Sequence, residues 1–263
     1  MTNEPMIPRN LIKHLEWSPM NSPPTQPPQN PSTRGNVPSN LDFSLSDETD
    51  FWRMTGVSYK GSIENIDLLK SLLDGGNAHT QDEWVTHYTT AAPGNGFYTP
   101  DYPLIYGIVK ALYDARDSVP ETAAVQTFLR DTARSKWLMT LSRIAYQPTG
   151  DDLVIHNYGT PARYERAVDF ITPDEWIKNT EKPDSYQALL GTEDSVQDIN
   201  TVFQWLNGTD TYAWKVNNKP ATLVERVARF NADSVRSDLN CSRYPDVRNS
   251  SLGVRAQKIG GST

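Results

Sequence analysis

Apolar residues at helical spacing characterise the first half of the chain. Ile63, Ile66, Leu69 and Leu73 recur every three or four positions after Ser62, a residue type that caps helices, and two glycines follow. This spacing predicts a helix over 62–74. The same pattern predicts three more helices, over 81–90, 103–116 and 120–134, with Leu104, Ile108 and Leu112 on the buried face of the second.

The pattern changes to that of strands after residue 136. The stretches 137–146 (WLMTLSRIAY) and 153–156 are predicted to be strands joined by a turn. A helix is predicted over 195–206, and short strands follow over 211–216, 224–232 and 251–256. Helices followed by strands, without repeated strand–helix–strand alternation, are typical of an α+β fold with helices packed on a mostly antiparallel sheet.

The N-terminal part has a different composition. Residues 18–40 are dense in Pro, Ser, Asn and Gln, which bury too little apolar area to offset the entropy of ordering. We therefore expect a Pro-rich extended arm over 1–50 and one folded domain over 51–263, beginning at Phe51. The arm is either a passive spacer or a Pro-rich segment that binds a partner.

Charge and cysteine content exclude several classes of protein. A net charge of −7 and a pI near 5.1 give no overall basic field, so binding to nucleic acid or anionic lipid is not expected. Cys241 is the single cysteine, which excludes an intrachain disulfide and a four-thiolate zinc site. No apolar run is long enough to cross a bilayer, and the first residues lack the apolar core of a secretory signal. The location of the protein stays open.

Sequence motifs give no support for catalysis. Phosphate loops, dinucleotide-binding turns, zinc-protease motifs and nucleophile elbows are all missing, so we expect no enzyme activity and no cofactor. His79, Glu83 and His87 have the four-residue spacing of a helical metal site, but exposed polar residues are the simpler interpretation because His79 falls at or before the helix start. Trp205 and Trp214 could floor a ligand pocket, although core packing is the commoner role of tryptophan.

The segment over 226–256 stands apart in composition. It contains no Lys, Glu, Gln, Trp or Met, although Glu225 and Gln257 lie directly on either side. All five missing types require a purine in the third codon position. A segment written largely in codons that end in a pyrimidine would have this composition.

The same segment alternates between two sets of residues. One set contains Asn231, Asp233, Val235 and Ser237, then Asn240, Ser242, Tyr244 and Asp246; the other contains Ala232, Ser234, Arg236, Cys241, Arg243 and Pro245. In extended backbone one such set faces solvent and the other faces inward. The first set consists largely of the adaptable hydrogen-bonding and aromatic types that antibody loops use for contact.

The residue pattern of this segment resembles that of a known family. The pattern RF-x-A-x-S-x-R-x-x-L-x-C-x-R-x-P, closing with SSLGVR, resembles the variable region of archaeal, Nanoarchaeota-type diversity-generating retroelement variable proteins. The stretches SKWLMTLSRIAYQPTG, VIHNYGT and NTVFQWLNGTDTYAWKV resemble the constant part of that family, so the resemblance covers about 129–258. In the family a reverse transcriptase rewrites adenines in template codons of the AAY type and leaves the third base in place.

The resemblance implies a C-type-lectin-like fold with a loop-rich C-terminal ligand-binding face. The positions implied to vary and to bind ligand are Asn231, Asp233, Val235, Ser237, Asp238, Asn240, Ser242, Tyr244, Asp246, Val247 and Asn249, with Arg248 as a borderline case. The implied scaffold positions are Phe230, Ala232, Ser234, Arg236, Leu239, Cys241, Arg243, Pro245, Leu252, Gly253, Val254 and Arg255, of which Phe230, Leu239, Leu252 and Val254 are expected in the core.

Departures from related proteins keep alternatives open. The chain lacks the E-P-N or Q-P-D loop of calcium-dependent lectins, so calcium-mediated sugar binding is not expected. The leading hypothesis is a monomeric recognition protein for an unknown macromolecular ligand, a protein by preference, with a cell-surface or extracellular role suggested by the family. One alternative is an enzyme like the formylglycine-generating oxidases, but their copper site needs two cysteines. The other is a structural assembly protein that attaches through its arm.

Overall fold

The computed structural model describes residues 43–89, 96–171, 176–177 and 182–257. The chain divides into two units, Met1–Ser39 and Asn40–Thr263, and every described residue belongs to the second. The expected arm lies outside the described residues, except for its last part. There β1 (Ser44–Asp47) pairs with β2 (Phe51–Tyr59), so the fold begins before Phe51.

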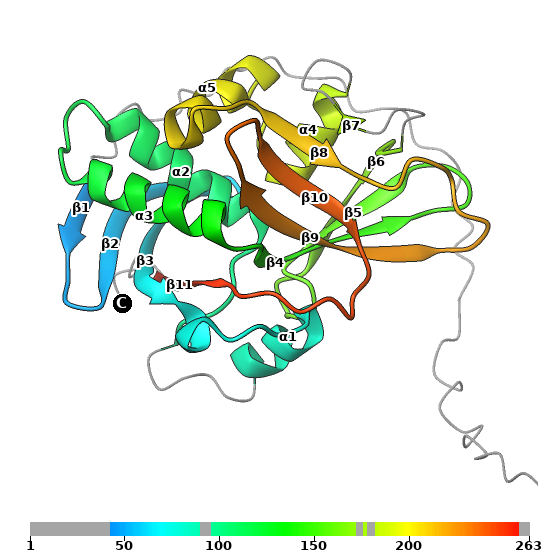
Figure 1. The fold of residues 1–263 in the computed structure, drawn as a ribbon, viewed down its shortest axis with the longest axis horizontal. Coiled ribbons are helices and arrows are strands. Elements are labelled where there is room, and N and C mark those ends of the chain that lie inside the picture. The colour runs from blue at the N-terminus through cyan, green and yellow to red at the C-terminus, as the bar shows by residue number, and fades with distance from the viewer. Residues whose placement is uncertain (1–42, 90–95, 172–175, 178–181, 258–263) are drawn as a thin grey trace, which may run out of the picture. The chain divides into compact units, whose positions relative to one another are not determined.

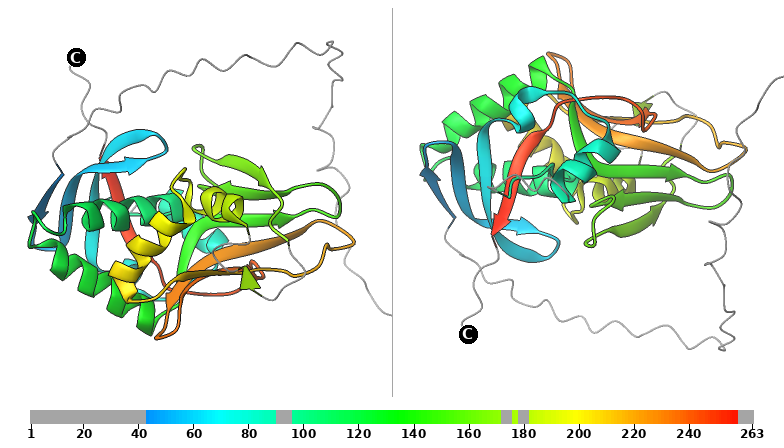
Figure 2. Two further views of the ribbon diagram at one scale, coloured as in Figure 1. Left: turned by 90° about the horizontal axis from the view of Figure 1, so that it is seen from above. Right: turned by 90° about the horizontal axis from the view of Figure 1, so that it is seen from below.

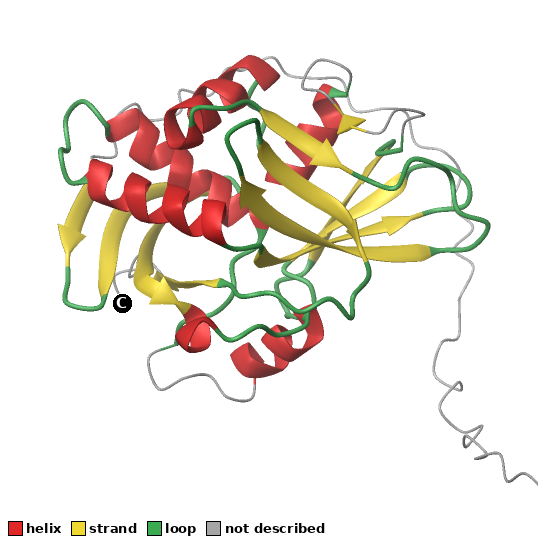
Figure 3. Cartoon of the chain, viewed as in Figure 1, coloured by secondary structure: helices red, strands yellow, loops and turns green. Residues whose placement is uncertain are grey.

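The described residues form a mixed α+β fold with two sheets (Figures 1 and 3). The small sheet has the order β1-β2-β3-β11, with β3 at Ser62–Leu72 and β11 at Leu252–Gln257. The large sheet has the order β6-β5-β4-β9-β10-β8-β7, and its bounds are β4 (Leu138–Tyr146), β5 (Asp152–His156), β6 (Tyr164–Val168), β7 (Trp176–Ile177), β8 (Thr211–Trp214), β9 (Val224–Ala232) and β10 (Ser237–Arg243). All described pairings of these strands are antiparallel except that of β8 with β10, which confirms a mostly antiparallel arrangement.

Most of the predicted elements are confirmed. The described helices are α1 (Gln81–Thr89), α2 (Tyr102–Ala115), α3 (Thr122–Ser135), α4 (Pro183–Leu190) and α5 (Val196–Asn207), together with a short 3-10 turn over Leu73–Gly76. Ser195 caps α5 by accepting a hydrogen bond from the Asp198 amide, and Gly208 ends the helix in the left-handed conformation. The sequence did not predict β1, β2, β6, β7, β10 or α4. None of the described helices is both long and apolar enough to cross a membrane.

The prediction of a helix over 62–74 is wrong, because this segment is β3. Lys60 and Gly61 both have positive φ, 53° and 72°, and make the tight turn that joins β2 to β3. The helical spacing arises because both faces of β3 are covered. Ile66 and Leu68 face the main core, whereas Leu69 packs against a second apolar cluster that contains Trp84 and Met139.

Helix α2 is the centre of the main core. Leu104, Ile108 and Leu112 are buried as predicted, and α2 contacts β2, β4, α3, α4 and α5 (Figures 1 and 2). Its close approach to β2 depends on Gly107, where an added Cβ would lie 2.3 Å from the Ser58 carbonyl oxygen. The helix therefore fixes the small sheet to the helical layer.

A row of inward side chains crosses four strands of the large sheet. Leu138 of β4 pairs with Phe230 of β9, Phe230 with Leu239 of β10, and Leu239 with Ala213 of β8. Each is 3% exposed or less, as are Leu252 and Val254 of β11. The four expected core positions Phe230, Leu239, Leu252 and Val254 are thus confirmed.

The Gly107→Ala substitution tests the contact between α2 and β2. Alanine normally stabilises a helix relative to glycine by about 1 kcal/mol, but here the methyl group meets the β2 backbone. We expect a net loss of roughly 1–3 kcal/mol in the free energy of unfolding, measured by guanidinium denaturation. A gain in stability would contradict the close packing of α2 on β2.

Candidate ligand-binding surface

The outward face of β8, β9 and β10 gathers polar and aromatic side chains from positions next to the inward row. Asn231 of β9 lies opposite Asp238 of β10, and Asp238 lies opposite Tyr212 of β8. In the next row Arg229, Asn240 and Trp214 are opposite one another. Directly paired residues share a face of the sheet, so all six side chains point away from the Phe230 row. Figures 1 and 2 show these three strands side by side.

Arg229 lies on β9, at the side of this face next to β4. Its guanidinium carbon lies 4.3 Å from the centre of the Trp137 ring. Nη1 donates to Asn249 Oδ1 at 3.1 Å and Nη2 donates to Asn240 Oδ1 at 3.3 Å, whereas Nε has no acceptor. The residue is 4% exposed, and this burial lowers the pKa of Arg229 to about 10. The guanidinium therefore contacts an aromatic ring and two amide oxygens.

Asp238 is a buried carboxyl group beside this arginine. It is 6% exposed, and its Oδ1 atom has no hydrogen-bond partner. Burial raises the pKa of Asp238 to about 7, although the charges of Arg236 and Arg229 act in the opposite direction. A carboxyl group that changes charge near neutral pH makes the electrostatics of this face pH-dependent.

Asn231 belongs to the outward face but also has a structural contact. Its Nδ2 donates to the backbone oxygens of Ala133 at 2.8 Å and Lys136 at 3.2 Å, at the C-terminal end of α3. These carbonyls lack a partner within the helix, so the side chain satisfies them. Replacement of Asn231 would affect the end of α3 as well as the surface.

The turn between β9 and β10 changes the expected alternation. The Asp233 carboxylate accepts from the amides of Val235 at 2.7 Å and Arg236 at 2.8 Å and so holds the turn, while Val235 is 70% exposed at its tip. The predicted outward position of Ser237 is wrong: it is fully buried, with its hydroxyl 3.2 Å from that of Thr209. Because Ser237 pairs with Ala232 across the turn, the outward set resumes at Asp238.

A register shift between Asn240 and Arg243 ends the alternation in β10. Cys241 is fully buried as expected, but Arg243 is exposed instead of inward. Ser242 lies within 3.4 Å of the Asn240 oxygen. Of the predicted scaffold, Ser234 is also exposed, at the turn.

The remaining predicted residues lie beyond β10. Tyr244 is 63% exposed, and the guanidinium of Arg226 stacks on its ring at 3.7 Å. Arg226 lies five residues from Asn231 along β9, roughly 16 Å at the rise of a strand. Asp246 is exposed and Val247 packs against the Trp84 cluster. The structure therefore brings Asn231, Asp238, Asn240 and Asn249 together around Arg229, but not Tyr244. Asp238 and Asn240 are on the outward side of the sheet as predicted, but they are buried, 6% and 5% exposed, and do not face solvent.

Sequence reasoning missed Arg229, Trp137 and Tyr212. Arg229 could have been found, since it has the same parity in β9 as Asn231. Nothing in the sequence links Trp137 or Tyr212 to this face, because both arrive by pairing of distant strands. Trp214 lies on this face, whereas Trp205 packs against the main core beside Tyr113.

The other candidates for metal binding were His79, Glu83 and His87, and His79 Nδ1 lies 3.8 Å from Glu83 Oε2. His79 precedes α1, and its Nε2 lies 2.6 Å from Asp74 Oδ2. In the described part of the chain no three His, Cys, Asp or Glu side chains are grouped to hold a metal ion. Burial also raises the pKa of the Cys241 thiol, which disfavours the nucleophilic thiolate.

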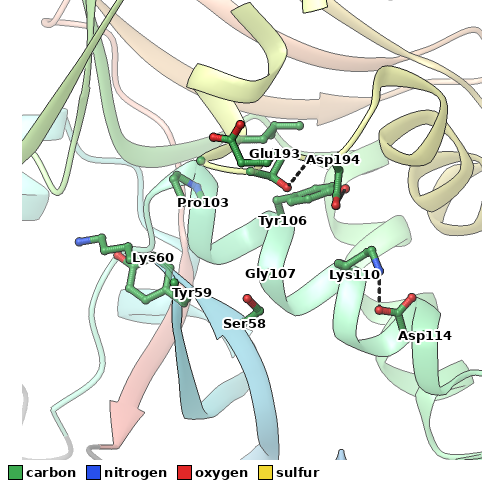
Figure 4. Close-up of a pocket in the computed structure, with 14 residues that line it drawn as sticks. Ser58, Tyr59, Lys60, Pro103, Tyr106, Gly107, Lys110, Asp114, Glu193 and Asp194 are labelled. Atoms are coloured by element: carbon green, nitrogen blue, oxygen red, sulfur yellow. Dashed lines mark hydrogen bonds and ion pairs between the residues drawn. The ribbon is translucent and has the colours of Figure 1, made fainter. Parts of the chain in front are cut away.

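A separate cavity of about 350 Å³ lies between the β2–β3 turn, α2 and the loop that precedes α5 (Figure 4). Gly107 lines this cavity, and charged side chains around the cavity form hydrogen bonds with neighbouring residues. Lys110 bonds to Asp114, and the Tyr106 hydroxyl donates to Asp194 at 2.7 Å.

No protein-family model, curated protein or solved structure matches this chain.

The Asp238→Asn substitution tests the buried carboxyl. Its folded pKa of about 7 exceeds the value of about 3.9 expected when unfolded, so its favourable contribution is complete below pH 4 and is lost as pH rises through 7. We expect the variant to match the native protein near pH 4 and to be more stable by roughly 1–3 kcal/mol at pH 8.

Thermal and denaturant unfolding at pH 4, 6 and 8 measure this difference. The control is Asp246→Asn, which removes a charge from an exposed side chain. Equal pH dependence of the Asp238→Asn variant and the native protein would exclude a raised pKa at this position.

Proposed function

We propose that this chain is a ligand-binding protein, the variable protein of a diversity-generating retroelement, with a C-type-lectin-like fold. The observation that carries the proposal is the pairing of an apolar inward row with a polar outward row on the same strands, β9 and β10. Such a sheet keeps its fold through one row while the other row changes. The proposed chain recognises a ligand through this surface and is not an enzyme.

The composition of the 226–256 segment supports this proposal independently of the fold. Codons ending in a pyrimidine account for its missing residue types, and adenine-directed rewriting of AAY codons yields that composition. Asn231, Asp238, Asn240 and Asn249 are the proposed variable residues around Arg229. Asp233, Val235 and Asp246 are exposed and extend the surface at its turns, whereas Ser237 is removed from the binding set because it faces the inward side of the sheet, with Ala232 and Leu239.

The proposed ligand is a macromolecule, by preference a protein. A sheet face and two turns offer a broad contact area with aromatic and amide groups, which suits a protein surface. Affinity would come from a few anchoring side chains in the middle of the face.

The genomic context tests the retroelement directly. We expect an imperfect repeat of the sequence coding for 229–255 near a reverse-transcriptase gene, with differences concentrated at adenines of the repeat. Sequencing of the flanking DNA provides the measurement. Differences spread evenly over the four bases, or no repeat at all, would remove the retroelement from the proposal.

Substitutions separate the framework from the surface. Leu239→Ala should lower the free energy of unfolding by roughly 2–5 kcal/mol, because it leaves a cavity under the sheet. Val235→Ser at the exposed tip should change it by less than about 0.5 kcal/mol. Asn231→Ala should cost about 1 kcal/mol through the end of α3. Denaturant unfolding of the three variants tests this order, and equal losses for Leu239 and Val235 would contradict it.

A further inference from the structure

Arg229 carries a buried positive charge that the described residues neutralise only in part. Its two acceptors, Asn240 Oδ1 and Asn249 Oδ1, are neutral amide oxygens, and Nε has no acceptor. Asp238 attracts it, but no described carboxylate forms an ion pair with it. A buried charge without an opposite charge is costly, so an incoming anion would be favoured.

The geometry of the guanidinium fits a carboxylate. The Arg229 guanidinium carbon lies over the Trp137 ring at 4.3 Å, and Nε remains a donor without an acceptor. Planar guanidinium groups bind carboxylates through two parallel hydrogen bonds, and these bonds are about twice as strong as bonds to neutral acceptors. Because Arg229 is only 4% exposed, a carboxylate would reach it by replacing one asparagine oxygen, an exchange of a weak acceptor for a strong one.

Local charge points to the same kind of partner. The segment over 226–256 contains six arginines and three aspartates, although the whole chain has a net charge of −7. Of these arginines, Arg236, Arg248 and Arg255 are paired with Asp233, Glu83 and Asp67, whereas the exposed Arg243 adds positive charge that acts on Arg229. The surroundings of Arg229 therefore attract acidic groups. Asn240 and Asn249 belong to the proposed variable set, whereas Arg229 does not.

We propose that Arg229, supported by Trp137, is the fixed anchor of this face and binds an aspartate or glutamate side chain of a protein partner. That the partner is a protein depends on the proposed function, but the affinity of Arg229 for a carboxylate does not. The variable asparagines around it then set how readily that carboxylate enters.

A carboxylate placed within the chain provides the first test. Asn240→Asp keeps the size of the side chain and puts a charged oxygen in reach of Nη2. We expect the equilibrium constant for unfolding to fall about tenfold at pH 7, and this gain to vanish in the Arg229→Gln background. The matched control is Asn218→Asp on the exposed loop after β8, which should change the constant less than twofold. No gain, or a gain that persists without Arg229, would overturn the anchor.

Acetate provides the second test, read from the indole N–H signal of Trp137 in NMR spectra at pH 6. Sodium acetate should shift this signal saturably, whereas sodium chloride at equal ionic strength should not. The Asn240→Asp variant should lose the acetate response because its own carboxylate occupies Arg229. Equal responses to acetate and chloride, or an undiminished acetate response in Asn240→Asp, would overturn the proposal even if Arg229→Gln does not fold.

These results are separable from those on the retroelement. Acetate binding without a genomic repeat would retain the anchor and reject the retroelement. A genomic repeat without acetate binding would do the reverse.

Discussion

The alternation of side chains along β9 and the first part of β10, from Ser237 to Asn240, is the constraint on which the rest of this structure depends. Phe230 and Leu239 close the core on one side of the sheet, so their neighbours Arg229, Asn231, Asp238 and Asn240 must face the other way. A shift of one residue in register would put two asparagines and an aspartate into the apolar core. The framework therefore fixes where each polar side chain points before any ligand is considered.

The outward face is nevertheless part of the structure. Asn231 completes the end of α3, Asp233 holds the turn between the strands, and Asn240 and Asn249 share Arg229. Substitution at each of these positions carries a cost set by the hydrogen bonds that the native side chain makes. Val235, by contrast, projects into solvent at the tip of the turn. A surface of this kind would vary most freely at its turns and more restrictively around Arg229.

Burial gives this face its electrostatic character. Asp238 and Arg229 are both nearly inaccessible, and removal from water disfavours the charged form of each. The result is a carboxyl that titrates near neutral pH beside an incompletely neutralised guanidinium. Both groups are sensitive to the charge of whatever covers them.

The sequence by itself determined the elements whose signals are local. The apolar stripes of α2 and α5 and the strands β4 and β9 follow from the pattern of apolar positions, and the family resemblance implied the inward positions of Phe230 and Leu239. Tertiary structure decided the rest. The spacing of β3 looked helical because two separate apolar clusters cover its opposite faces, and Ser237 turned inward because a four-residue turn reset the alternation. Trp137 and Tyr212 joined the site only through strand pairing, which depends on contacts between distant segments that no local pattern encodes.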